Sequence, residues 1–327
     1  MTRLVVALAL LTIILMAVSV AVGYAPLDVG EALSDLLAGR QTLEAMVLSE
    51  LRLPRAVLGA AVGFSLGVMG AALQGLMRNP LADPGVVGVS GAAALGAVVV
   101  FYFGVSSAFA LALPLGGLAG AGLATAFLLT LARRGASTAT LILAGVALNS
   151  LAGALTALAL NLAPSPYAAL EVVFWLMGSL SDRSLLHVAL ALPFMIFGWA
   201  LVLSTGRAMD ALTLGEDTAA SLGFSLRRTR LLVVGGTAAA VGASVAVAGA
   251  IGFVGLVVPH LMRPLVGHRP GRLLLVSGLA GAALTLGADI LVRLVPTRPE
   301  LKLGVVTALI GAPFFLALLR RLKVEGE

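Results

Sequence analysis

Long apolar stretches separated by short polar segments run along the whole chain. They fall at about residues 4–24, 55–77, 85–103, 110–132, 138–160, 185–204, 231–250, 251–262, 272–293 and 303–319. Most are close to the roughly 20 residues that a helix needs to cross a bilayer, and they are continuous, unlike the alternating strands of a β-barrel. The stretch 251–262 is too short to cross and contains Pro259, so we expect it to lie within the bundle. The pattern predicts an all-α fold, a polytopic transmembrane helical bundle of about ten spans that forms one domain over residues 1–327.

The composition agrees with a membrane environment. Hydrophobic residues make up 60% of the chain, charged residues only 11%, and the mean hydropathy is +1.10. A soluble domain carries about 25% charged residues, so this chain has too little polar surface to cover itself in water. The apolar run after Arg3 is longer than the roughly 7–15 residues of a secretory signal core, and we therefore interpret it as the first span.

Basic residues outnumber acidic ones by 21 to 15. Such an excess can indicate nucleic-acid binding, but in a membrane protein it is more typical of cytoplasmic loops, so we expect no nucleic-acid partner. If the N-terminus is cytoplasmic, ten segments return the C-terminus to the cytoplasm. About two thirds of the basic residues then fall on the inside. This bias predicts that both termini are cytoplasmic.

Glycines recur at helical spacing in two of the stretches. Gly59, Gly63 and Gly67 repeat every four residues, and Gly116 and Gly120 repeat in the same way. Such stripes of small residues let helix backbones approach closely in lipid. We interpret them as packing positions inside one bundle, with a dedicated dimer seam as the alternative.

Sequence signatures of catalysis are missing. The chain has neither GxSxG nor HExxH, and its three histidines, His187, His260 and His268, fall in different loops of the predicted topology, which argues against a shared metal site. The absence of cysteine excludes disulfides and thiolate metal ligands. No GxxxxGK[ST] is present, so any ATP hydrolysis that drives this protein takes place on another subunit.

Charged residues gather at the predicted outer ends of two spans. Arg52 and Arg55 lie three residues apart and so share a helix face. They are either interfacial anchors or a cationic handle for an acidic partner. Asp289 and Arg293 are spaced to pair within one helix, and Arg293 is also placed to face outward beside the other two arginines.

The end of the second span is broken by two prolines. Pro80 and Pro84 follow Gln74 and Asn79 in the segment QGLMRNPLADPG, and proline ends helices because it lacks an N–H and restricts its predecessor. Broken backbone at membrane depth is tolerated where it is buried in protein or lines a cavity, and a plain turn between spans is the alternative.

The segment from about 207 to 230 is the longest predicted cytoplasmic loop. Residues 215–223 within it read as a short helix, because Glu216 and Asp217 favour its first turn and Gly223 is placed to end it. Apolar residues around this helix are unexpected in a loop exposed to water; they are Leu212, Leu214, Leu222 and Phe224. The segment is either a helix on the bilayer surface or a docking helix for a cytosolic subunit.

These places carry a resemblance to the FecCD family of ABC importer permeases, which serve ferric siderophores, haem and vitamin B12. The matching segments are RLPR at 52–55, Gln74 with RNPLADP at 78–84, GVSGA at 88–92, WLMGSL at 175–180, LG at 214–215 and 222–223, GFVGLVVPH at 252–260 with Arg263, AD at 288–289 with Arg293, and GVVTALIGAPFF at 304–315. These segments are distributed along nearly the whole chain after the first span. The family usually shows ELPVG before the last span, where this chain has ELKLG at 300–304, so Lys302 replaces a proline.

The resemblance implies a permease of the bacterial inner membrane that forms a homodimer around a central path. Its implied partners are two cytosolic ABC ATPase subunits, which hold the ATP and Mg²⁺, and a periplasmic substrate-binding protein, besides membrane lipid; this chain itself binds no cofactor. Arg52, Arg55 and Arg293 correspond to the residues that dock the binding protein.

The resemblance also assigns roles inside the membrane and at its inner face. Residues that correspond to the ATPase-coupling element are Leu212, Leu214, Gly215, Glu216, Asp217, Ala219, Leu222, Gly223 and Phe224. Asn79 and Leu81 match the family's helix break at the inner mouth of the translocation path. The rest of this path is expected to be mostly apolar, with isolated polar groups at Gln74, Asn149 and Ser150.

Two other classes of function remain as alternatives. A self-sufficient secondary transporter usually couples through acids inside the membrane, and Asp289 is the only acid within a predicted span. An intramembrane enzyme needs a nucleophile with a base or clustered ligands, which the sequence lacks. The motifs leave the substrate open among siderophores, haem and cobalamin, with a ferric siderophore favoured.

Overall fold

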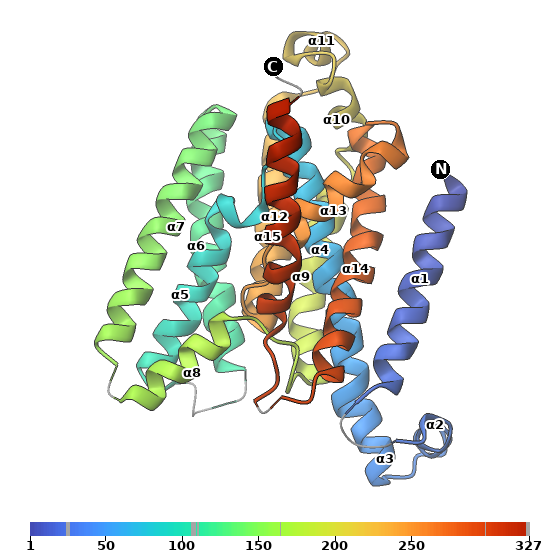
Figure 1. Ribbon diagram of the computed structural model, residues 1–327. Helices are drawn as coiled ribbons and strands as arrows, with labels where there is room; N and C mark the ends of the chain where they lie inside the picture. The colour runs from blue at the N-terminus through green and yellow to red at the C-terminus, as the bar shows by residue number, and fades with distance from the viewer. Residues whose placement is uncertain (24–26, 106–108, 110, 164, 298, 325–327) are drawn as a thin grey trace.

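The structure is a computed structural model and describes residues 1–23, 27–105, 109, 111–163, 165–297 and 299–324. The regular secondary structure of this part of the chain is all helical, without strands, as the apolar pattern predicts (Figure 1). The elements of the first half are α1 Thr2–Ala21, α2 Val29–Leu37, α3 Leu43–Met46, η1 Val47–Arg52, α4 Leu53–Met77, η2 Pro84–Val87, α5 Val89–Tyr102, α6 Ala112–Arg133 and α7 Thr138–Asn161. Those of the second half are α8 Pro166–Leu176, α9 Leu185–Leu203, α10 Gly206–Leu212, α11 Glu216–Ser221, α12 Leu226–Ala248, α13 Val254–Met262, η4 Pro264–Val266, α14 Pro270–Leu294 and α15 Leu303–Val324.

Seven helices of the described chain are long and apolar enough to cross a membrane. They are α1, the continuous run α3–η1–α4, α6, α7, α9, α12 and α14. Three shorter apolar helices, α5, α8 and the start of α15, accompany them. Because these three are shorter than a typical span, the number of about ten spans stays a prediction. Helix α13 has nine residues, in line with the expectation that this stretch is too short to cross.

Two boundaries differ from the sequence-based expectation. Helix α8 was missed because Pro166 and Glu171 interrupt its apolar character. Helix α12 begins at Leu226 and not near residue 231, because Arg227, Arg228 and Arg230 lower the hydropathy of its first turns without ending the helix. The connection before α12 is therefore shorter than expected and is itself largely helical.

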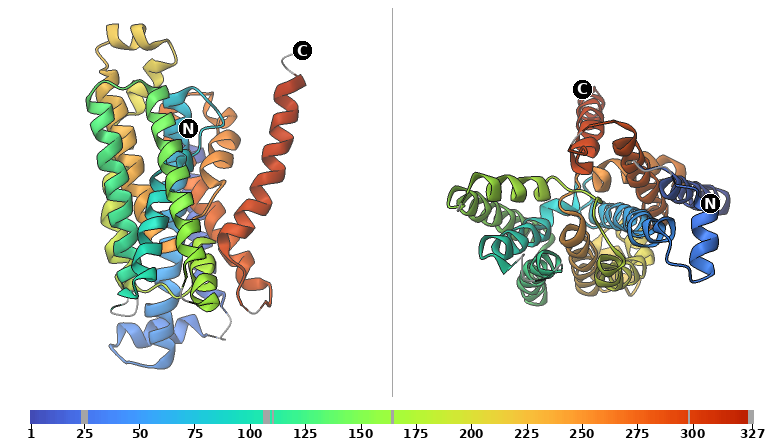
Figure 2. Two further views of the ribbon diagram at one scale, coloured as in Figure 1. Left: turned by 90° about the vertical axis from the view of Figure 1, so that its left-hand side faces the viewer. Right: turned by 90° about the horizontal axis from the view of Figure 1, so that it is seen from below.

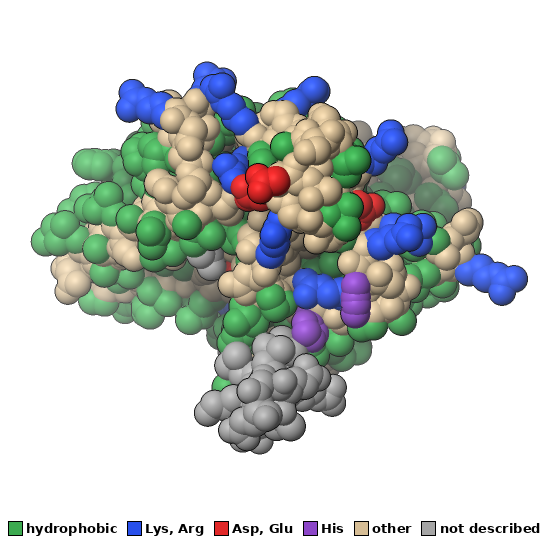
Figure 3. Space-filling model, turned by 90° about the horizontal axis from the view of Figure 1, so that it is seen from above, with side chains coloured by type: hydrophobic (Ala, Val, Ile, Leu, Met, Phe, Trp, Pro, Cys, Tyr) green, Lys and Arg blue, Asp and Glu red, His purple; other side chains and the backbone are tan. Residues whose placement is uncertain are grey.

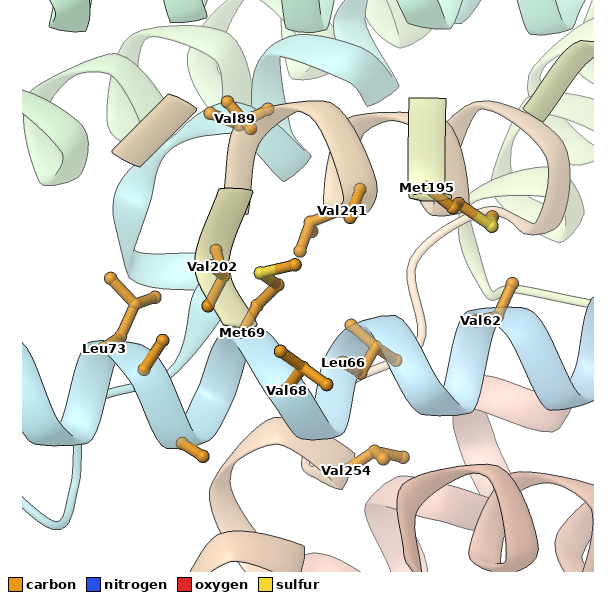
Figure 4. Packing of buried hydrophobic residues seen from close by; sticks show 14 of the residues in the cluster. Val62, Leu66, Val68, Met69, Leu73, Val89, Met195, Val202, Val241 and Val254 are labelled. Atoms are coloured by element: carbon orange, nitrogen blue, oxygen red, sulfur yellow. The ribbon is translucent and has the colours of Figure 1, made fainter. Parts of the chain in front are cut away.

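Helix α4 lies at the centre of the bundle and is mostly buried inside the protein. Figure 4 shows other helices approaching it from opposite sides. The buried side chains at this junction include Val62, Leu66, Val68, Met69 and Leu73 of α4, Met195 and Val202 of α9, Val241 of α12 and Val254 of α13. Helix α4 is therefore the central helix around which the others pack.

The glycine stripe of α4 packs against α14. A Cβ atom on Gly63 would lie 2.3 Å from the carbonyl oxygen of Gly281, and one on Gly67 would lie 2.0 Å from that of Ser277. The stripe at Gly116–Gly120 meets α5 at similarly short range. Both contacts lie within the chain, which confirms the interpretation of the stripes as bundle packing.

We expect Gly67→Ala to destabilise the protein by about 1–3 kcal/mol, because the new methyl group meets backbone that cannot move aside. Gly153→Ala on α7 is the matched control, since a Cβ there meets nothing within 4 Å. Alanine has the higher helix propensity, so the control is expected to be neutral or slightly stabilising. Thermal unfolding in detergent measures both variants, and equal melting temperatures would contradict the packing argument.

The two ends of the bundle differ. Helices α10 and α11 lie at the same end as both chain termini, whereas α2 and α3 lie at the opposite end (Figure 1). Figure 3 views the first of these ends and shows Lys and Arg side chains around much of its rim. Figure 2 shows α15 diverging from the body of the bundle. We call the end with α10 and α11 the basic end, and the end with α2 and α3 the opposite end.

Candidate functional site

A buried ion cluster lies near the opposite end, between α4 and α14. Asp289 is 1% exposed and accepts hydrogen bonds from Arg55 Nε and Nη2, the latter at 2.8 Å. Arg293 Nη2 lies 2.9 Å from the other Asp289 oxygen, which confirms the predicted pairing along one helix. Arg55 also pairs with Glu300 in the segment before α15. The cluster joins three parts of the chain that are distant in sequence.

Two arginines of this region also hold the end of α1. Arg52 Nη1 donates to the carbonyl oxygens of Val20 and Ala21 at 2.9 and 2.7 Å. Arg293 Nη1 donates to those of Ser19 and Val22 at 2.7 and 2.6 Å. The last carbonyls of a helix lack intrahelical partners and carry partial negative charge, so both arginines stabilise the end of α1.

The three arginines proposed for docking are thus engaged within the chain. Arg52 and Arg293 are only 6% and 7% exposed, and the side chain of Arg55 is 13% exposed. Arg55 and Arg293 face two acids, Asp289 and Glu300, and Arg52 donates to the end of α1. A role of these three arginines in docking a binding protein stays a prediction. They are mostly buried and bonded within the chain, unlike charges that are free on a surface.

Glu300 responds to its place in this cluster. Burial alone would raise the pKa of its carboxyl, but the hydrogen bond and positive charge of Arg55 outweigh burial and hold the pKa below its usual value. The stability that the pair contributes is therefore present at neutral pH and is lost when the pH falls through the lowered pKa. Two residues on, Lys302 lies 5.6 Å from the centre of the Phe174 ring, so the residue that replaces the family's proline contacts α8.

Helices α10 and α11 form a protruding pair at the basic end (Figure 1). The predicted short helix is present as α11, with Glu216 and Asp217 in its first turn. Gly223 adopts a φ of +87°, a left-handed conformation that suits glycine and ends the helix. Leu214 and Leu222 are 64% and 58% exposed on either side of α11.

The other residues assigned to coupling anchor this pair. Leu212 and Ala219 are buried, and Phe224 packs against the core while partly buried. Gly215 adopts a φ of +111° between the two helices. Leu212, Ala219 and Phe224 thus form an inward anchor. The exposed residues of the assigned set are Leu214, Glu216, Asp217, Leu222 and Gly223.

Hydrogen bonds tie α10 to the spanning helices. Asp210 Oδ1 accepts from the Gly271 N–H at the start of α14 at 2.8 Å, and Arg78 Nη2 donates to the Leu212 carbonyl at 2.7 Å. Sequence reasoning missed Asp210 and Arg78 as linking residues, because their partners are 61 and 134 positions away and no local pattern marks them. Through these bonds α10, which precedes α11, is connected to α4 and α14.

The residues assigned to the path occupy two separate places. Gln74 is 2% exposed; its amide donates to the Leu256 carbonyl at 3.2 Å and accepts from Arg263 Nη2 at 2.6 Å. It therefore joins α4 to α13, with Arg263 as a partner that reasoning about the path did not include. Asn149 and Ser150 are exposed on α7 instead.

The helix break itself follows the expected chemistry. Arg78 adopts a left-handed φ of 48° at the end of α4, and the side chain of Asn79 accepts the Leu81 N–H at 2.9 Å. Asp83 in turn accepts the N–H of Gly85 at 2.8 Å. Nearby side chains thus accept the backbone N–H groups of Leu81 and Gly85 in this turn. Asn79 is exposed and Leu81 is partly exposed.

Comparison with known proteins assigns the chain to a family. The model of the FecCD transport family matches residues 11–321. The chain belongs to the FecCD transport family. Members of this family are permease subunits of ABC importers and not enzymes, and ATP hydrolysis takes place on a separate subunit.

Individual relatives agree with this assignment. The chain is 42% identical to the cobalamin import system permease protein BtuC of Halobacterium salinarum over 284 residues, which cover 86% of this chain and 75% of the relative. It is 40% identical to the Fe(3+) dicitrate transport system permease protein FecD of Escherichia coli, over 93% of this chain and 94% of FecD. A solved structure described as an inward-facing metal-chelate type ABC transporter superposes with a TM-score of 0.85 at 30% identity, covering 98% of this chain and all of the other. This FecCD-family chain is therefore a multi-pass membrane permease of the ABC importer type.

Proposed function

We propose that this chain is the membrane-spanning subunit of an importer that carries a metal chelate, either an iron chelate or cobalamin, from a binding protein into the cytoplasm. The observation that carries the proposal is the pair α10–α11 at the basic end. Exposed Leu214 and Leu222 form an apolar surface on a protrusion that is anchored to α4 and α14. An ATPase that covers these leucines would bury apolar area and move the spanning helices through one rigid connection.

The basic end is the cytoplasmic end in this proposal. Arginine side chains gather there, and cytoplasmic loops carry the excess of Lys and Arg (Figure 3). Both termini and α10–α11 then lie in the cytoplasm of a bacterial cell, with the chain in the inner membrane. Two ATPase subunits, which hold ATP and Mg²⁺, would dock at this end.

A homodimer fits the exposed polar residues of α7. Asn149 and Ser150 lie near the middle of this 24-residue helix, where lipid contact leaves polar groups without partners. A second copy placed against this face would enclose them, and they would line a path at the interface together with the turn at Asn79 and Leu81.

The opposite end is proposed to receive the binding protein. Arg52, Arg55 and Arg293 gather at this end, and a two-fold dimer presents the group twice. An acidic patch on each lobe of the binding protein would complement this arrangement.

The direct test is reconstitution. We expect the purified chain in liposomes to show no ATP hydrolysis and no uptake, and to gain both when its P-loop ATPase and binding protein are added. Radiolabelled ferric dicitrate and cyanocobalamin are the two substrates to compare. Uptake that proceeds without the ATPase and follows a proton or sodium gradient would instead identify a secondary transporter.

A further inference from the structure

An open apolar groove of about 810 Å³ runs between α6, α9 and α12, away from every site described above. Its floor is made of small residues of α6 and α12, including Gly122, Ala126, Gly235 and Ala239. Its volume falls within the range of about 300–1,000 Å³ that is typical of small-molecule sites.

The groove runs along α6 and reaches the basic end. Its lining extends along α6 from Leu115 to Arg133, about 27 Å at 1.5 Å per residue, which is close to the roughly 30 Å of a hydrocarbon core. Phe194 and Phe197 of α9 are 46% and 58% exposed beside it. An occupant of this groove would therefore be exposed on the outer surface of the bundle.

Among the described residues that line the groove, the charged side chain lies at one end. Arg133 lines it there, and Arg227 donates from Nη2 to the Arg133 carbonyl oxygen at 2.8 Å, so the two residues are neighbours. Both are exposed, and within the described part of the chain neither takes part in an ion pair with an acidic side chain. An anion at this end would meet two guanidinium groups that no acidic side chain of the described residues neutralises.

We infer that the groove is a binding site for an anionic phospholipid of the leaflet at the basic end. An acyl chain lies on the small residues between α6, α9 and α12, and the phosphate accepts hydrogen bonds from Arg133 and Arg227. Arginine pairs well with phosphate because its planar fork offers two parallel donors. Basic pockets between spanning helices on the cytoplasmic side are suited to acidic headgroups.

A second groove on the same helix provides an internal comparison. It has about 530 Å³, lies between α5, α6 and α7, and has only apolar residues along its walls, such as Leu123, Phe127 and Leu155. Both grooves can take acyl chains, but only the first combines its apolar floor with cationic groups. Selectivity for an acidic headgroup is therefore expected at the first groove alone.

Native mass spectrometry of the delipidated full chain, titrated with phosphatidylglycerol or phosphatidylcholine, tests the site. We expect the unaltered chain to bind phosphatidylglycerol preferentially. The double variant Arg133→Gln/Arg227→Gln is expected to bind it about fivefold more weakly for each arginine removed, and so to lose the preference. Arg134→Gln removes an equal charge next to the groove and is expected to keep it.

A second variant tests the apolar part. Gly122→Leu places a side chain in the groove at a position where a Cβ meets nothing within 4 Å. We expect it to weaken binding of phosphatidylglycerol, whereas Gly287→Leu, at an equally open position of α14 outside both grooves, leaves binding unchanged. Melting of each variant without lipid shows that it is folded, and Gly122→Ala serves if the leucine variant is not.

Three results would overturn the inference. The first is an unchanged headgroup preference in the double arginine variant, and the second is unchanged binding in the folded Gly122 variants. The third is a copurifying polypeptide that crosslinks to residues of the groove. None of these results depends on transport, so the proposed function stands or falls separately.

Discussion

Asp289→Asn is expected to reduce stability more than any other single substitution considered, by about 3–5 kcal/mol. Asp289 is 1% exposed and neutralises Arg55 and Arg293, which are themselves mostly buried. Asparagine keeps the shape but removes the charge, so two guanidinium groups remain with only Glu300 to balance them. The measurement is the thermal or denaturant unfolding of the purified chain in detergent, together with the yield of folded protein in the membrane.

Glu216→Gln is the matched control for this experiment. The Arg230–Glu216 pair has a similar contact distance of 3.2 Å, but the Glu216 side chain is 52% exposed. Exposed pairs contribute up to about 1 kcal/mol, so the control is expected to melt almost as the unaltered chain does. If Asp289→Asn melts no lower than Glu216→Gln, the buried cluster does not stabilise the fold in the way that its geometry indicates.

Leu222→Asp is expected to abolish capture of the ATPase while this chain folds normally. Leu222 is 58% exposed beside α11, so in the free permease the new carboxylate remains in water. In the proposed complex it would be buried without a partner, and a central contact residue of this kind contributes 2 kcal/mol or more. The affinity for the ATPase should fall at least about thirtyfold, and uptake should fall with it.

Ser221→Asp provides the charge control for the coupling experiment. It introduces the same carboxylate one residue earlier, at an exposed polar position of α11. Pull-down of the ATPase and ATP-driven uptake are measured for both variants, and the binding protein should still dock to both. Normal capture and transport by Leu222→Asp would show that α11 is not the coupling element.

The proposed docking role of Arg52 and Arg55 is best tested by substitutions on the binding protein. Reversing Arg52 and Arg55 to Glu would remove the bonds to α1 and break the pairs with Asp289 and Glu300, so such a variant would lose stability as well as any docking. Acid-to-Lys substitutions on the binding protein leave this permease intact. They should weaken docking more at low salt than at high salt, because salt screens exposed charges.

The sequence by itself determined the helical class, the membrane environment and the short helix at residues 216–221. Continuous apolar runs, stripes of small residues and a glycine after an acidic first turn are local patterns, and local patterns specify local structure. The resemblance of its motifs also identified the family before any contact was known, and the comparison with the family model confirmed it.

Only the tertiary structure decided how the candidate residues are used. Arg55 meets Asp289 across 234 positions, Arg293 meets Ser19 across 274, and Gln74 meets Arg263 across 189. Arg52, Arg55 and Arg293, which the sequence placed at the ends of spans, connect helices to one another. The groove that ends at Arg133 is lined by three helices, so no single segment of the sequence predicts it. The physical reason is that ion pairing, hydrogen bonding and cavities depend on which helices become neighbours, and that choice is made by the packing of the whole bundle.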